Sequence, residues 1–254
     1  MEIGPEVFIQ SDECHRYLVG LMGEVLACER HGILKGDINV EPIMNGVEIS
    51  VSGLFALAQD GTIVQVEKLE ASLATNNDGY IIIRQEGSTE IGQEGIPYKT
   101  PRYKCCISDI QNGDIIIGKI DNRRMNDSYI PPCYTIDAHP RLKNLCDQCI
   151  KDLEEIKTKM ASKNINGDIT LLELLAMELN DLSLKESPKE LYRLLSKIIF
   201  CLNKLNPATT YPEATTFINK DIAESLIPLR DYLVRYNQAL DSIVETPKGR
   251  PYDV

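Results

Sequence analysis

The spacing of apolar residues changes from a strand period to a helix period at the Ile130-Pro131-Pro132-Cys133 segment. Before this segment, from about residue 37 to 120, apolar and polar residues alternate, which is the period of a half-buried strand. After it, apolar residues recur every three or four positions, which is the period of a helix packed along one face. Two consecutive prolines end any helix and stiffen the backbone where the period changes. The sequence therefore predicts an α+β fold, with an antiparallel, β-sandwich-like module over residues 1–136 and an α-helical bundle over residues 137–254.

Two turn dipeptides divide the sheet module into predicted hairpins. Asn45-Gly46 predicts a type I′ turn, because both central residues of that turn adopt positive φ angles. Asp60-Gly61 predicts a second hairpin in the same way. Tyr80–Ile83 and Ile115–Ile117 are short apolar runs and are expected to be buried strands. The polar, Gly-containing stretch from Glu86 to Pro101 between them is expected to be a long loop.

Helical spacing appears once before the sheet module and then throughout the second half of the chain. Serine or threonine at a predicted N-cap, and proline in a first turn, mark where these helices begin. Pro228 lies inside the last helix and is expected to bend it. The predicted helices run from Ser11 to about Arg30, from Pro140 to about Lys163, onward from the capping boxes at Thr170 and Ser187, and from about Lys220 to Val244.

The helix from Pro140 has six apolar residues at the a and d positions of a heptad repeat. Four helices of one chain can bury such stripes against one another, so the spacing leaves open whether the partner is in the same chain. Because this helix directly follows the rigid Pro131-Pro132 segment, we assign its stripe to a predicted oligomer interface. The six residues are Leu142, Cys146, Cys149, Leu153, Ile156 and Met160.

The balance of charges argues against two classes of partner. With 27 basic and 38 acidic residues the net charge is −11, and the longest basic run is Arg123-Arg124. Such a chain repels phosphate backbones and anionic lipid surfaces, so neither nucleic acid nor membrane is an expected partner. No apolar run approaches the roughly 20 residues of a membrane span, and the start at Met1 resembles no secretory signal. The eight cysteines are therefore expected to be reduced thiols in a cytoplasmic protein.

Cys146-x-x-Cys149 is the strongest candidate for a redox or metal-binding site. Redox pairs of this spacing lie at a helix N-terminus, where the thiol pKa is lowered, and zinc sites need a second pair of ligands. Here both cysteines fall inside a predicted helix at consecutive positions of an apolar stripe. We therefore interpret them as packing residues that bind no metal.

The remaining candidates for catalysis or metal binding are weaker. Cys133 and His139 could form a thiol–imidazole pair, but the surrounding sequence resembles no nucleophile turn. Glu86, Glu90 and Glu94 could gather a divalent cation, although a solvated loop is the simpler interpretation. The chain also lacks the glycine-rich phosphate-binding motifs and the H-E-x-x-H zinc motif. We therefore expect no catalytic residue, no cofactor and no metal, and interpret the chain as a structural protein rather than an enzyme.

Several short segments in a fixed order carry a resemblance to a known family. They are Glu13–Leu18, Gly53–Thr62, Tyr80–Arg84, Tyr129–Cys133, Pro140–Leu142 and Ser187–Tyr192. In this order and spacing the chain resembles TssK, also called ImpJ or VasE, the baseplate component of type VI secretion. The family shares a strand that ends at an Asp-Gly turn, an Ile-Pro-Pro segment that leads into helices, and a late Pro-x-x-Leu-Tyr stretch.

The resemblance implies a role for each half of the chain. Residues to about 136 would be a shoulder domain, similar to the shoulders of phage receptor-binding proteins, that binds other baseplate subunits of the TssF and TssG kind. The helical remainder would be a neck that forms a homotrimer. The family also has a C-terminal head that docks to a membrane complex, and since this sequence ends at Val254 the resemblance covers shoulder and neck only. An anchor for a receptor-binding protein in a phage tail or prophage remains an alternative.

Overall fold

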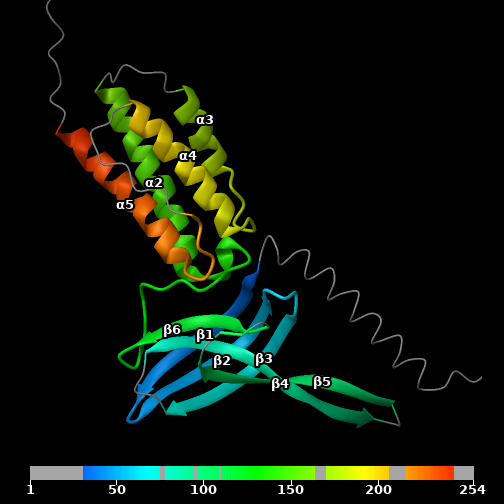
Figure 1. The fold of residues 1–254 in the computed structure, drawn as a ribbon. Coiled ribbons are helices and arrows are strands. Elements are labelled where there is room, and N and C mark those ends of the chain that lie inside the picture. The colour runs from blue at the N-terminus through cyan, green and yellow to red at the C-terminus, as the bar shows by residue number, and fades with distance from the viewer. Residues whose placement is uncertain are drawn as a thin grey trace, which may run out of the picture. The chain divides into compact units, whose positions relative to one another are not determined.

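The computed structural model describes residues 31–74, 78–93, 96–108, 110–111, 113–163, 170–205 and 216–242, with no side chains described for residues 89–100. The helix predicted from Ser11 to about Arg30 lies outside these residues. Figure 1 shows two β-sheets and four α-helices in the described part, so the predicted α+β class is confirmed.

The chain divides into two compact units. The sheet unit comprises the described residues up to Lys143 together with Leu184–Pro188 and Ile218–Ala223. The helical unit comprises Asn144–Ser183, Lys189–Phe217 and the described residues from Glu224 onward. The two short segments are thus parts of the helical sequence that belong to the sheet unit. The domain boundary after residue 136 stays a prediction, and the units differ from it chiefly in these two segments.

The sheet unit contains two antiparallel sheets. The first has the order β1-β2-β3 and the second the order β5-β4-β6-β7. Contacts of β3 with β5, and of β1 with β6 and β7, bring the two sheets together. The strands are β1 (Gly32–Ile43), β2 (Gly46–Leu57), β3 (Ile63–Ala74), β4 (Gly79–Gln93), β5 (Ile96–Ile107), β6 (Ile115–Asp121) and β7 (Arg124–Met125).

Alternation along the strands builds the core of this unit. In β2, Val47, Ile49 and Val51 are buried, as a strand with one face turned inward requires. The two apolar runs predicted as buried strands, Tyr80–Ile83 and Ile115–Ile117, fall in β4 and β6. All six isoleucines of these runs are buried, which confirms that prediction.

The turn predicted at Asp60-Gly61 is confirmed. Gly61 has φ +84°, and its N–H donates to the Ala58 carbonyl at 3.0 Å. The Thr62 N–H donates to Oδ1 of Asp60 at 2.9 Å, and Leu57 then pairs with Ile63 across the hairpin. Asp60 thus accepts a hydrogen bond from the turn backbone and Gly61 supplies the positive φ, which are the two properties that make this dipeptide a turn signal.

The type I′ turn predicted at Asn45-Gly46 is wrong. Ile43 pairs with Gly46, so the two-residue loop is Met44-Asn45, and Gly46 already belongs to β2. Neither residue of the predicted turn has a positive φ. A Cβ on Gly46 would lie 1.9 Å from the Leu73 carbonyl oxygen. Glycine is required here because β3 approaches the backbone closely, and not because of the turn.

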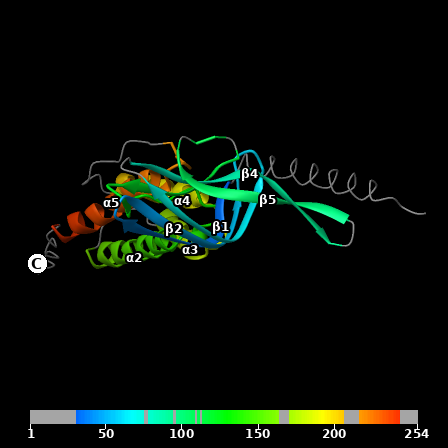
Figure 2. The ribbon, with the colours of Figure 1, turned by 90° about the horizontal axis from the view of Figure 1, so that it is seen from below.

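The long loop predicted from Glu86 to Pro101 is also wrong. Strands β4 and β5 form an extended antiparallel hairpin in this region, and its far end projects beyond the other strands of the unit (Figure 2). A register shift between Gln85 and Ser88 interrupts the hairpin. Because β5 is an edge strand, it tolerates prolines that cannot donate a ladder hydrogen bond. Polar composition and prolines therefore indicated an edge hairpin rather than a loop.

The proline-rich segment runs beside the first strand. Ile33 N–H donates to the Pro132 carbonyl at 2.9 Å, and Tyr134 N–H donates to the Ile33 carbonyl at 2.8 Å. Together these bonds form a parallel bridge between Ile33 and Cys133. A proline carbonyl can accept such bonds although the ring nitrogen cannot donate one. The segment that ends the strand pattern is thus held by backbone hydrogen bonds to β1.

The two short segments of the sheet unit are held in the same way. Ile136, which begins a 3₁₀ turn over Ile136–Ala138, donates its N–H to the Glu186 carbonyl at 3.0 Å. Ile222 donates its N–H to the Ile130 carbonyl at 3.1 Å. The chain therefore returns to the proline-rich region twice after it has entered the helices.

Within the described residues, four helices follow the proline-rich segment, and each coincides with a predicted one. α4 starts at Pro188, directly after Ser187, as its capping box predicts. α5 continues through Pro228. Leucines and isoleucines on the inner faces of these helices are buried and form the core of the helical unit. The helices are α2 (Pro140–Ser162), α3 (Thr170–Asn180), α4 (Pro188–Leu205) and α5 (Ile222–Asp241).

Candidate functional site

The six residues of the predicted oligomer interface lie on α2 and are buried within the single chain. None of them is more than 2% exposed. They are Leu142, Cys146, Cys149, Leu153, Ile156 and Met160. The assignment of this stripe to an interface between copies stays a prediction, and with the side chains already packed it would require the bundle to open.

The two α2 thiols have the surroundings of packing residues. Burial raises the pKa of Cys146 to about 11, with the nearby Asp147 carboxylate acting in the same direction. Burial also raises the pKa of Cys149. A redox or metal-binding thiol needs a lowered pKa, because the thiolate is the reactive form. Among the described residues, no group of three His, Cys, Asp or Glu side chains could hold a metal ion.

Cys133 and His139 are each held in a form unsuited to nucleophilic catalysis. The Cys133 thiol donates to the Pro131 carbonyl at 3.3 Å, and burial raises its pKa. Burial lowers the pKa of His139 to about 4, helped by Arg141, so its imidazole is neutral at pH 7. His139 lines a hollow of about 260 Å³ in the sheet unit.

Of the three glutamates considered for a cation site, only Glu86 has a described side chain. Its Oε1 accepts a hydrogen bond from Lys104 Nζ at 2.5 Å, in an ion pair across the β4–β5 hairpin. That hydrogen bond lowers the pKa of Glu86. The carboxylate is thus engaged with a cationic side chain on the neighbouring strand.

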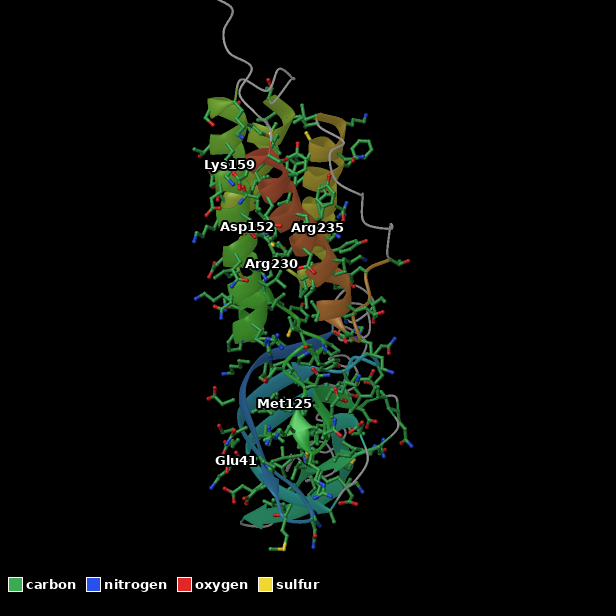
Figure 3. All side chains as sticks on the ribbon, turned by 90° about the vertical axis from the view of Figure 1, so that its left-hand side faces the viewer. Glu41, Met125, Asp152, Lys159, Arg230 and Arg235 are labelled. Atoms are coloured by element: carbon green, nitrogen blue, oxygen red, sulfur yellow. The ribbon has the colours of Figure 1, made fainter. Side chains whose placement is uncertain are left out.

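The helical unit also carries ion pairs between α2 and α5. Figure 3 labels Asp152, Lys159 and Arg230 of these pairs. Asp152 Oδ2 lies 3.8 Å from Arg230 Nε, and Lys159 Nζ lies 2.6 Å from Asp241 Oδ1. Burial raises the pKa of Asp152, while Arg230 opposes this shift. These pairs link two helices of the same chain.

The outer face of α3 is apolar. Leu171, Leu174 and Met177 recur every third residue, which places them on neighbouring turns of one face, and they are 54%, 58% and 60% exposed. Glu173 and Glu178 are also exposed, and α3 contains no basic residue. We name these five residues the acidic stripe. The inner face of α3, formed by residues such as Leu172 and Leu175, is buried, so this helix is apolar on both sides.

The outer face of α4 is basic, opposite in sign to the two glutamates on the outer face of α3. Arg193, Lys197, Phe200 and Lys204 are exposed and follow one another at intervals of four, three and four residues, which places them on one face. Lys204 Nζ lies over the Phe200 ring, 4.5 Å from its centroid. Arg193 Nη1 lies 2.9 Å from Glu190 Oε1. We name the four exposed residues the basic stripe.

No protein-family model matches this sequence, and no curated protein matches it significantly. Solved structures do match. TssK from the type VI secretion system of EAEC, in complex with nanobody nb18, aligns over 90% of this chain and 68% of its own at 12% identity and a TM-score of 0.68. A crystal structure of TssK aligns over 96% and 68% at 16% identity and a TM-score of 0.67.

A third match comes from the TssK-TssF-TssG baseplate subcomplex solved by cryo-electron microscopy. It covers 94% of this chain and 96% of the matched chain, at 13% identity and a TM-score of 0.65. This chain has the fold of TssK. The resemblance to TssK carried by short motifs is therefore confirmed for the fold, and the matches extend across both the sheet unit and the helical unit.

At these identities the TssK fold says little about individual surface residues. The acidic and basic stripes are not evident from the sequence, because the spacing of apolar residues marks the inner helix faces and the basic residues of α4 form no continuous run. Reading the outward positions of α3 and α4 separately, as a second face of each helix, would have found them.

Among the described residues, no helix is long and apolar enough to cross a membrane.

Proposed function

We propose that this chain is a structural subunit of the baseplate of a contractile injection machine of the type VI secretion kind. The observation that carries the proposal is the likeness to TssK across both units, including a TssK chain within a baseplate subcomplex that matches over 96% of its length. A fold shared across both units fits a protein whose work is to hold other subunits in place.

The two units divide this role. The sheet unit binds baseplate subunits similar to TssF and TssG, and the helical unit joins three copies of the chain. The raised thiol pKa values and the neutral His139 support a structural role rather than catalysis, because neither group is activated. Assembly on a baseplate also implies a cytoplasmic location.

Co-purification tests the baseplate role. The chain, produced together with TssF-like and TssG-like proteins from the same genome, is expected to elute with them as one complex in size-exclusion chromatography. A well-folded chain that elutes alone in the presence of both partners would contradict the proposal. Neighbouring genes for a capsid and terminase, in place of sheath and membrane-complex genes, would favour the phage-tail anchor instead.

Light scattering tests the trimer separately. At tens of micromolar the expected mass is three times 28.5 kDa. A monomer mass at that concentration would rule out trimerisation while leaving the baseplate role open.

A further inference from the structure

We propose that copies of this chain associate by docking the acidic stripe of α3 in one copy onto the basic stripe of α4 in the next. This inference rests on the proposed trimer and specifies the surfaces that form it. Both stripes lie within the helical unit.

The acidic stripe has the composition of a surface that is covered in an assembly. Single exposed leucines are ordinary, but here three large apolar side chains occupy consecutive turns of one short helix. Each of them is more than half exposed. Clustered apolar side chains with a polar rim mark protein interaction sites, and Glu173 and Glu178 supply that rim here. The helix is thus built to be covered on both faces.

The basic stripe is unusual in this chain. The protein carries a net charge of −11, yet α4 has four basic residues against one acidic residue. Phe200, 52% exposed in the middle of the stripe, adds an aromatic side chain that can pack on leucine or methionine. An acidic, apolar surface would find both its charge partner and its packing partner on this face.

Repulsion between like charges favours a contact between the acidic stripe of one copy and the basic stripe of another. Two acidic stripes placed face to face would bring four glutamates together, and two basic stripes would do the same for lysine and arginine. Pairing α3 with α4 instead places opposite charges around an apolar centre. When each copy offers α3 to one neighbour and α4 to the other, the contact is heterologous, and heterologous contacts close into rings when the rotation permits. A ring of three copies satisfies every stripe.

Charge reversal with rescue tests this contact. The pair Glu173→Lys and Glu178→Lys makes the α3 face basic, and the pair Lys197→Glu and Lys204→Glu makes the α4 face acidic. Each pair alone is expected to reduce the mass measured by light scattering threefold, from trimer to monomer. All four substitutions in one chain restore opposite charges and are expected to restore the trimer. Circular dichroism checks that every variant keeps its helical content.

The matched control is Asp231→Lys with Arg235→Glu, a charge reversal at exposed positions of α5 outside both stripes. It is expected to leave the trimer intact. A wild-type trimer that survives both stripe reversals, a failed rescue, or a control that dissociates equally would each overturn the inference without touching the proposed trimer. A wild-type monomer would overturn both. A wild-type dimer that shows reversal and rescue would support the stripe pairing and contradict the trimer.

Discussion

Helices α2 and α3 each carry apolar residues at helical spacing, but one set is buried and the other is exposed to solvent. The six stripe residues of α2 are buried inside the chain, whereas Leu171, Leu174 and Met177 of α3 are each more than half exposed. Periodicity shows that a helix has an apolar face, but it does not show which molecule covers that face. An interface between copies is therefore better sought among the apolar residues that the fold leaves uncovered.

The largest expected effect comes from truncating the α2 stripe. Leu153→Ala removes a side chain that is 1% exposed and leaves a cavity, so it should lower the free energy of unfolding by about 2–5 kcal/mol. Urea denaturation followed by helical circular dichroism measures this. A loss below about 0.5 kcal/mol, which is typical of surface positions, would show that the Leu153 side chain is not part of the core.

A smaller loss is expected when a buried thiol becomes a hydroxyl. Cys149→Ser places a stronger hydrogen-bonding group at a fully buried position of α2, which should cost about 1–3 kcal/mol. Gln148→Ser, at the exposed neighbouring position, serves as the control and should change the unfolding free energy little. Equal effects of the two substitutions would argue against the inward orientation of Cys149.

The pH dependence of stability tests the surroundings of Asp152 on the partly buried side of α2. Because its folded pKa is raised above the ordinary value near 3.8, its contribution to stability is greatest below that value and is lost as the pH rises through the folded pKa. Between pH 3 and pH 6 the wild type should therefore lose stability relative to Asp152→Asn. Solvent screening keeps this change below about 1 kcal/mol. A difference that stays constant over this range would contradict the raised pKa.

The smallest effect is expected on α3. Leu174→Ala, the matched counterpart of Leu153→Ala, should change the unfolding free energy by less than about 0.5 kcal/mol when measured below the concentration at which copies associate. A loss comparable to that of Leu153→Ala would mean that Leu174 is covered within the single chain, and the contrast between the two helices would disappear.

Local chemistry decided which turns could be predicted from the sequence. Asp60-Gly61 was predictable because both residues act on their own backbone, through the Asp60 carboxylate and the positive φ of Gly61. Gly46 was misread because its role depends on the Leu73 carbonyl of another strand. A glycine demanded by a close approach cannot be distinguished from a turn glycine until the partner strand is known.

The β4–β5 hairpin was missed for a related reason. An edge strand does not need a continuous apolar face, so its sequence resembles a polar loop. The helices were predictable to within a few residues because capping signals and helical spacing agree at Pro140 and Pro188. The exposed stripes were not predicted, because exposure depends on which faces the rest of the bundle covers.

The return of the helical sequence to the proline-rich region has a consequence for the timing of synthesis. Tyr129 Oη donates to the Lys220 carbonyl at 2.6 Å, a bond that joins residues 91 positions apart. At roughly 5–20 residues per second a ribosome takes on the order of 5–18 s to make that stretch. During that interval the strands have been made but the segment that completes their unit has not. The sheet unit therefore acquires its full set of hydrogen bonds only after α2, α3 and α4 have been synthesised.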